Sequence, residues 1–262
     1  MNNSIHLPAQ IASQFTRAAT SYDSLAIVQK VIADDLLEVL TTRRFERLLD
    51  VGCGTGRVTQ QLSEHAEQVI GLDLSMGMLR FAQTQLAMSP LSNITWLNAD
   101  ADELPLTSNS IDGVFSSMAL QWSQNLSGCY QELFRVCRPN ARVVLAIMSH
   151  GSLFELAEAW QILDQQQHIN AFHDPQALLR KALHAGFTGE ANVKTYTTWH
   201  PNVTGAMHSI KDIGAQKAVA TDNVVSLTKG RLIRLQQRYA ELYEQAGQIP
   251  LTYKVTFLEL EK

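Results

Sequence analysis

The sequence predicts an α/β fold in which a mostly parallel sheet is flanked by helices. One observation is that short apolar runs alternate with helical patterns five times, about 25–30 residues apart. The other is that the first of these runs ends in the glycine-rich turn DVGCGTG at 50–56, which is typical of a connection from a buried strand to a helix. A ligand of such a sheet is expected beyond the carboxyl ends of its strands.

The expected elements follow from the spacing of apolar residues along the chain. A first helix is expected over 9–40. Strands are expected at 48–51, 68–72, 94–97, 111–116 and 142–148, with helices at 55–65, 75–86 and 126–136 between them. Ser75 is the expected N-cap of the helix at 75–86. After these elements, helices are expected at 152–166, 174–185, 203–213 and 227–245, and strands at 194–199 and 251–260.

The chain is expected to form a single domain over 1–262, since 262 residues with 45% hydrophobic content can bury one large core. Within it, 1–45 would form an N-terminal helical lid and 46–150 the ligand-binding core. Residues 151–262 would complete the sheet and carry a helical cap insertion at about 200–247. Such a cap could close on a substrate.

Composition and charge exclude several classes of function. A net charge of −4 argues against nucleic acid as the main partner. No apolar run approaches the ~20 residues of a membrane span, and the first residues, MNNSIHLPAQIASQF, lack the layout of a signal peptide. Three cysteines fit a reduced compartment, so we expect a cytoplasmic protein with no membrane partner. No His, Asp or Glu cluster has metal-ligand spacing, and no metal is expected.

The glycine turn distinguishes between two classes of cofactor. The dinucleotide fingerprint G-x-G-x-x-G would need its third glycine at 57, which is Arg57 here. Instead the glycines are Gly52, Gly54 and Gly56, and Asp50 precedes them. This D-x-G-x-G-x-G form resembles motif I of the class I S-adenosylmethionine-dependent methyltransferases. The alternative is a tight turn that holds no ligand.

Two acidic residues support the first interpretation. Asp73 ends the second expected strand, where a carboxylate can accept hydrogen bonds from both hydroxyls of a ribose. It could also be an acid near a helix N-cap. Asp100 follows the third strand, at the place where an acid in these methyltransferases meets the adenine amino group and the backbone of the next residue, here Ala101, adds a contact.

The similarity extends over nearly the whole chain. It covers IASQFTRAATSYDSLAIVQ at 11–29, MALQWSQNLSGCYQELFRVCRP at 118–139, HGSLFELAEAW at 150–160, HINAFHDPQAL at 168–178, HSIKDIGA at 208–215 and the final PLTYKVTFLELEK. In these segments the chain resembles the malonyl-acyl-carrier-protein O-methyltransferases of biotin synthesis. The resemblance implies a Rossmann-like class I methyltransferase fold with a seven-stranded, mostly parallel sheet, an N-terminal helical lid and a helical cap insertion.

The resemblance also implies a reaction and a set of site residues. The free carboxylate of a malonyl thioester, on acyl carrier protein or coenzyme A, would be methylated, and S-adenosylhomocysteine would be released. Tyr22 matches a lid tyrosine that shields donor and acceptor. The expected donor-binding residues are Arg17, Asp50, Gly52, Cys53, Gly54, Gly56, Asp73, Leu74, Met78, Asp100, Ala101 and Met118. The expected acceptor-binding residues are Gln121, Trp122, Phe172 and Lys211.

Several of these residues keep a second interpretation. Arg17 either meets the carboxylate of the donor or is solvated, and Lys211 either meets the acceptor carboxylate or is a surface lysine. Met78 could be core packing, Trp122 could be structural, and Cys53 is expected to fill the turn rather than act as a nucleophile. A carboxylate acceptor is already ionised at pH 7 and needs no general base.

One departure bears on the substrate. The family usually has an arginine where this chain has Ala171, so the acceptor carboxylate must be held otherwise, through Lys211 or His168, or the substrate differs. The alternatives are a methyltransferase for another small acid or a quinone-type acceptor, and a donor-binding protein without catalysis. An acidic carrier protein would favour a basic face, either Arg135, Arg138 and Arg142 or Lys229, Arg231, Arg234 and Arg238.

Overall fold

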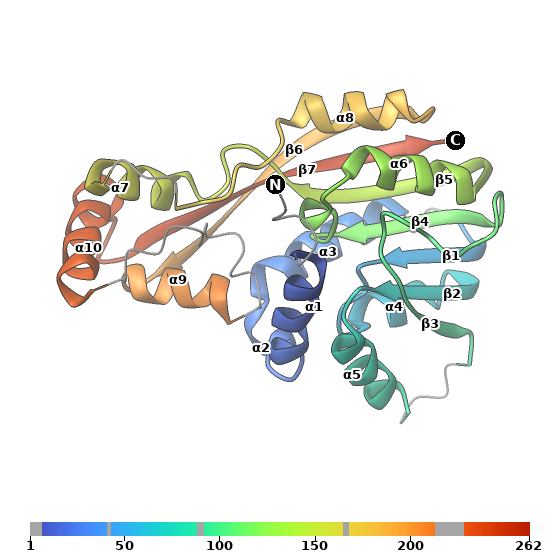
Figure 1. Ribbon diagram of the computed structural model, residues 1–262, viewed down its shortest axis with the longest axis horizontal. Coiled ribbons are helices and arrows are strands. Elements are labelled where there is room, and N and C mark those ends of the chain that lie inside the picture. The colour runs from blue at the N-terminus through green and yellow to red at the C-terminus, as the bar shows by residue number, and fades with distance from the viewer. Residues whose placement is uncertain (1–6, 41–42, 88–91, 165–167, 213–227) are drawn as a thin grey trace.

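The computed structural model describes residues 7–40, 43–87, 92–164, 168–212 and 228–262 (Figure 1). In these ranges seven strands form one sheet in the order β3-β2-β1-β4-β5-β7-β6. The strands are β1 Phe45–Val51, β2 Ala66–Asp73, β3 Ile94–Asn98, β4 Ile111–Ser117, β5 Cys137–Met148, β6 Thr188–His200 and β7 Ile249–Glu261. β1 to β5 pair in parallel, whereas β7 runs antiparallel to both β5 and β6. The mostly parallel α/β sheet expected from the sequence is confirmed.

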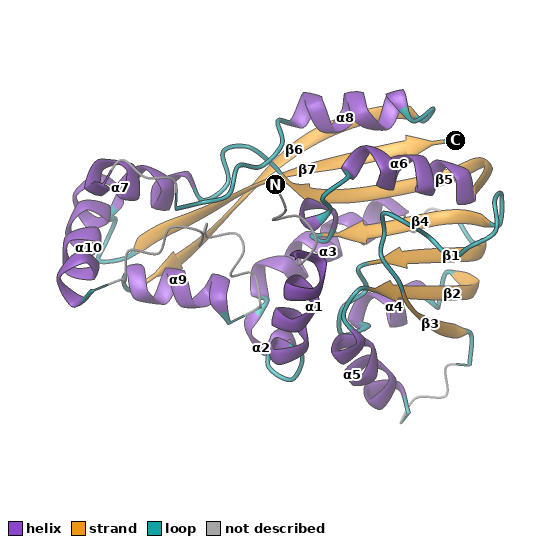
Figure 2. Cartoon of the chain, viewed as in Figure 1, coloured by secondary structure: helices purple, strands orange, loops and turns teal. Residues whose placement is uncertain are grey.

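Helices cover both faces of this sheet and one end of it (Figure 2). The helices are α1 Leu7–Ala18, α2 Tyr22–Leu25, α3 Ile27–Leu40, α4 Arg57–Leu62, α5 Met76–Leu86, α6 Leu126–Val136, α7 Phe154–Asp164, α8 Pro175–His184, α9 Val203–Lys211 and α10 Lys229–Tyr243, with a 3-10 turn at Leu120–Trp122. α1 and α2 lie beside the carboxyl ends of the parallel strands, and α7, α9 and α10 gather at the far end of the long β6–β7 hairpin. No helix within these ranges is long and apolar enough to cross a membrane.

The single helix expected over 9–40 is wrong, because this segment forms three helices with breaks after Ala18 and at Ala26. Serine hydroxyls donate hydrogen bonds to backbone carbonyls at the first break. Ser21 Oγ donates to Ala18 O, and Ser24 Oγ donates to Ser21 O. Such local bonds compete with helix continuation. Apolar spacing continues on both sides of each break, so periodicity alone did not indicate the turns.

Other boundaries shift by a few residues. β5 begins at Cys137 rather than at 142, because Asn140 takes a left-handed conformation (φ +61°) within a register shift between β4 and β5. β6 and β7 are also longer than expected, since they pair with each other along their whole length, from Thr188 opposite Glu261 to His200 opposite Ile249. The expected cap at Ser75 is formed, and Asp174 caps the start of α8. The part of the expected cap insertion at 213–227 lies outside the described residues.

Two apolar clusters fill the space on the two faces of the sheet. The first cluster packs α3 against the sheet and continues along β7 to the helices at the far end of the hairpin, with Ile32, Leu36, Val144, Leu235 and Tyr239 among its members. The second cluster packs α6 and α8 against the opposite face. Helices on both faces explain why the parallel strands have nearly continuous apolar sequences.

Candidate functional site

The glycine turn after β1 brings the backbone close to the rest of the site. Gly52, Gly54 and Gly56 all have positive φ, from +56° to +78°. A Cβ at Gly52 would lie 2.2 Å from the Cβ of Ala119, so this turn and the loop after β4 touch there. A Cβ at Gly54 would meet no atom within 4 Å. The turn therefore packs tightly at Gly52 and faces open space at Gly54.

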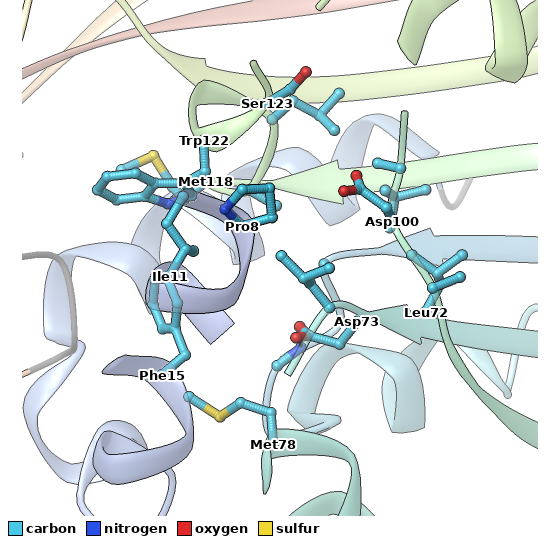
Figure 3. Close-up of a pocket in the computed structure, with 18 of the residues that line it drawn as sticks. Pro8, Ile11, Phe15, Leu72, Asp73, Met78, Asp100, Met118, Trp122 and Ser123 are labelled. Atoms are coloured by element: carbon cyan, nitrogen blue, oxygen red, sulfur yellow. Dashed lines mark hydrogen bonds between the residues drawn. The ribbon is translucent and has the colours of Figure 1, made fainter. Parts of the chain in front are cut away.

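A first cavity lies at the carboxyl ends of β1, β2 and β4, closed on its other side by α1 (Figure 3). It lies where the strand order reverses, as expected for a ligand site in such a sheet. Ten of the residues that the sequence singled out line it: Tyr22, Gly52, Gly54, Asp73, Leu74, Met78, Asp100, Ala101, Met118 and Trp122. Pro8, Ile11 and Phe15 of α1 face them.

Asp73 is held in this cavity by hydrogen bonds to both of its carboxylate oxygens. One of its carboxylate oxygens accepts the backbone N–H of Gly54 at 2.9 Å, and the other accepts that of Ser75 at 2.7 Å. Burial raises the pKa of Asp73 to about 6, while these two hydrogen bonds oppose the rise. Each oxygen keeps a second lone pair that a ligand hydroxyl can use.

A second pair of acids borders the same cavity. Asp100 accepts the backbone N–H of Asp102 at 3.0 Å, and Asp102 accepts the hydroxyl of Ser123 at 2.5 Å and the backbone N–H of Asn125 at 3.2 Å. These bonds join the loop after β3 to the loop after β4. Asp102 and Ser123 line the cavity but were not singled out from the sequence. The sequence signal that could have indicated Asp102 is that it is the second acid of the run ADAD at 99–102, because aspartates in such runs often accept hydrogen bonds from the backbone of their own turn.

A second cavity lies beside the glycine turn and shares Tyr22, Gly52, Gly54 and Ser117 with the first. Asp50 and Cys53 line it rather than the first cavity. Asp50 is only 2% exposed and accepts the Thr59 hydroxyl at 2.6 Å; burial raises its pKa to about 7. Burial also raises the pKa of the Cys53 thiol well above its usual value, as fits a filler of the turn.

A third cavity opens between the lid helices and the far end of the sheet. Its lining is Phe15, Tyr22, Gln29, Met118, Gln121, Trp122, Met148, Leu153, Ile210 and Tyr253. Of the described residues, Tyr22 alone lines all three cavities. Burial, followed by the nearby charges of Asp73 and Asp23, raises the pKa of Tyr22, so its phenol stays neutral at physiological pH.

Contacts of the lid hold Tyr22 at this junction. The hydroxyls of Thr16 and Ser75 lie 2.8 Å apart and join α1 to the start of α5. The hydroxyl of Thr55 donates to Asp23 at 2.7 Å and joins the glycine turn to α2. Phe15 packs against the rings of Tyr22 and Trp122, with centroid distances of 6.4 and 6.0 Å.

Four of the expected site residues lie outside the three cavity linings. Arg17 is exposed on α1, because the face that meets the first cavity carries residues 8, 11 and 15, and a residue two positions later points away. Gly56 packs against the ring of Trp96. Phe172 packs against the first cluster, and Lys211 is exposed at the end of α9.

The other candidate for the acceptor carboxylate, His168, also lies elsewhere, because its ring stacks on Trp160 with a centroid distance of 4.0 Å. Ala171, at the position where the family usually has an arginine, is exposed. Gln29, Met148, Leu153, Ile210 and Tyr253 line the third cavity although the sequence did not single them out. They come from five separate segments, and no local pattern connects them. The described residues contain no group of three or more potential metal ligands.

Comparison with known proteins agrees with this geometry. A family model described as a methyltransferase domain matches residues 49–145. The chain is 35% identical to a malonyl-acyl-carrier-protein O-methyltransferase of Serratia marcescens, over 94% of this chain and 93% of that protein. It is 34% identical to the protein of the same name from Salmonella typhimurium, over 96% of each. A protein of Saccharophagus degradans named biotin biosynthesis bifunctional protein BioHC is 33% identical over 97% of this chain and 46% of its own length.

Solved structures show the same fold at low sequence identity. The YcgJ protein of Bacillus subtilis superposes with a TM-score of 0.61 at 14% identity, over 92% of this chain and 98% of that one. A phosphoethanolamine N-methyltransferase of Haemonchus contortus, solved with S-adenosylmethionine, gives a TM-score of 0.55 at 19% identity, over 87% of this chain and 52% of that one.

Proposed function

Because this chain belongs to the family of malonyl-acyl-carrier-protein O-methyltransferases, we propose that it methylates the free carboxylate of a malonyl thioester, with S-adenosylmethionine as donor. The thioester is carried by acyl carrier protein, or by coenzyme A in its place. The observation that carries this proposal is the meeting of three cavities at Tyr22, since two of them fit the donor and the third fits the acceptor.

The residues of the first two cavities fit S-adenosylmethionine. Asp73 keeps an open lone pair on each oxygen for the ribose hydroxyls, and Asp100 with Ala101 suits the adenine amino edge. Leu74 and Met78 give the adenine an apolar wall. The open space at Gly54 leaves room for a ligand against the backbone. The methionine end of the donor fits the second cavity beside Asp50.

The chain needs little catalytic machinery for this reaction. A malonyl carboxylate is ionised at pH 7, so no side chain has to remove a proton from it. S-adenosylmethionine supplies a methyl group on a sulfonium: the carboxylate oxygen forms the new bond to carbon, and the electron pair of the broken bond stays on sulfur. The residues around Tyr22 align the two reactants and exclude water from them. The products are the malonyl thioester with its free carboxylate converted to a methyl ester, and S-adenosylhomocysteine.

The partner is an acyl carrier protein, and α10 is the better of the two candidate basic faces. In the other group, Arg135 pairs with Glu132, Arg138 with Glu46 and Arg142 with Glu259, at N–O distances of 2.6 to 3.3 Å. On α10, Arg238 pairs with Glu241, but Lys229 and Arg234 are exposed and have no ion pair to another described residue. An acidic carrier would therefore meet unneutralised charge on α10.

The name of the Saccharophagus degradans relative supports a place in biotin biosynthesis. There the methyl ester would mask the free carboxylate, so that the enzymes of fatty-acid synthesis can extend the malonyl group. We also propose that the enzyme works in the cytoplasm without a metal, a membrane or a nucleic acid. Its three cysteines are buried and free, as fits a reducing compartment.

The test is an assay with purified protein, methyl-labelled donor and malonyl thioesters of acyl carrier protein and of coenzyme A. We expect a base-labile methyl ester on the thioester. Gly54→Ala should weaken donor binding because its methyl group enters the donor space, although the unliganded protein has room for it. Donor binding without ester formation, or faster transfer to a different acid, would overturn the proposed substrate.

A further inference from the structure

The third cavity contains no cation among the residues that the structure describes. Its polar groups are the hydroxyls of Tyr22 and Tyr253, the indole N–H of Trp122 and the amides of Gln29 and Gln121. All five are neutral. The two basic residues considered from the sequence lie outside this lining. Lys211 is exposed at the end of α9, and the ring of His168 stacks on Trp160. A carboxylate bound in this cavity must be held by neutral donors.

Gln29 is the side chain best placed for this role. It stands in the first turn of α3, is half-buried, and lines both the second and the third cavity. Its amide makes no hydrogen bond to another described residue. Gln121 differs, because its Nε2 already donates to Met118 O at 2.7 Å and its Oε1 is buried without a partner. One of the two N–H donors of the Gln121 amide is thus already used, and its free oxygen is an acceptor, which a carboxylate cannot use.

We propose that the Gln29 amide, together with the Tyr22 hydroxyl, holds the acceptor carboxylate at the border between the donor and acceptor cavities. The inference rests on the proposed function and names the residue that holds its substrate. Tyr22 borders all three cavities and its phenol stays protonated, so it can donate a hydrogen bond there. The carboxylate lies where the methyl group must pass.

Neutral donors suit this chemistry. A guanidinium or ammonium would form a strong charge-assisted pair with the carboxylate and draw electron density from the attacking oxygen. Two neutral hydrogen bonds replace part of the lost hydration and leave the charge on the nucleophile. The positive sulfonium of the donor then supplies the attraction that a protein cation would otherwise give. This arrangement requires no arginine at position 171.

The test compares Gln29→Met, which keeps the length of the side chain, with Gln29→Glu, which adds a negative charge. Gln83→Met is the matched control, because Gln83 is exposed on α5. For malonyl-coenzyme A we expect Gln29→Met to lower kcat/KM about tenfold or more, mainly through KM, and Gln29→Glu to lower it further. Tyr22→Phe should also lower kcat/KM. Donor affinity, measured by calorimetry, should stay within about twofold of wild type in Gln29→Met.

Three results would overturn the inference while wild type still forms the ester. The first is an unchanged kcat/KM in Gln29→Met. The second is a loss of donor affinity with an unchanged KM for malonyl-coenzyme A, which would assign Gln29 to the donor alone. The third is a rise in KM in Lys211→Ala as large as in Gln29→Met. Absence of ester formation by wild type would instead overturn the proposed function.

Discussion

The carboxylate of Asp73 accepts the backbone N–H of Gly54 at 2.9 Å and thereby joins the end of β2 to the glycine turn after β1. The turn and this acid, which lines the first cavity, are therefore joined as one unit. The second oxygen of Asp73 accepts the N–H of Ser75, just before α5 begins. A change at Asp73 would alter both the lining of the cavity and the backbone around it.

Asp73→Asn should weaken binding of S-adenosylmethionine by about tenfold or more, because an asparagine turns an NH2 donor towards one of the two backbone N–H groups. Titration calorimetry measures the effect. Glu67→Gln is the control, since Glu67 is an exposed acid on the same strand. Donor affinity in Asp73→Asn equal to that of wild type would contradict the assignment of Asp73 to the ribose.

Gly52→Ala should destabilise the fold more than Gly247→Ala does. Both glycines have φ near +75°, so the conformational penalty is matched, but only Gly52 has a neighbour, the Ala119 Cβ at 2.2 Å. The difference in the free energy of unfolding should be about 1–3 kcal/mol, the usual range for overpacking. Urea denaturation measures it. Equal losses in the two variants would mean that the turn and the Ala119 loop can separate freely.

Asp50 and Asp73 should make the donor-free protein less stable as pH rises from about 4 to 7. Burial raises the pKa of Asp50 to about 7 and that of Asp73 to about 6, above the ~3.9 of an unfolded aspartate. The folded chain then binds more protons than the unfolded chain in this window, and its free energy of unfolding decreases with rising pH.

Asp50→Asn should remove most of this dependence. Relative to wild type, the free energy of unfolding of the variant should rise by roughly 2–3 kcal/mol between pH 5 and pH 8. Urea midpoints at the two pH values, read for both proteins, give the comparison. Parallel pH profiles would show that Asp50 is already ionised in the folded protein.

Arg234→Glu should lower kcat/KM for malonyl-acyl carrier protein and leave that for malonyl-coenzyme A unchanged. The side chain is exposed on α10, where charge would guide an acidic carrier. Arg80→Glu is the control, because Arg80 is an exposed arginine on α5 and its replacement gives the same change in net charge. The effect should shrink in high salt. Equal loss with both substrates would relate Arg234 to catalysis or folding instead.

The residues that line the first cavity could be predicted from the sequence because their signals are local. The glycine turn, Asp73 and Asp100 each follow a strand within a few residues, and parallel strands bring their carboxyl ends to one edge. The residues expected there lie together with few exceptions. Arg17 is the exception in the lid, since the rotation of a helix about its axis depends on packing that spacing alone does not fix.

The third cavity was harder to predict, for a physical reason. Its lining comes from α1, α2, α3, the loop after β4, β5, α9 and β7, which meet only when the sheet is assembled. Gln29 in particular appears in the sequence as an ordinary polar residue of an amphipathic helix. It lines the third cavity because α3 is a separate helix that begins after the break at Ala26. The preceding break after Ala18 is accompanied by serine hydroxyl bonds, which hydrophobic spacing does not indicate.

The first cluster makes this chain difficult to divide. The segment matched by the methyltransferase family model, 49–145, excludes both α3, which covers Val144 on one face, and β7, which pairs with β5. If 49–145 were expressed alone, the apolar face that α3 covers would be exposed. β5 would then be an unpaired edge strand, which favours aggregation. The segment with the most recognisable motifs is therefore no independent module, and shuffling or fusion of this enzyme should preserve the chain from the lid to the last strand.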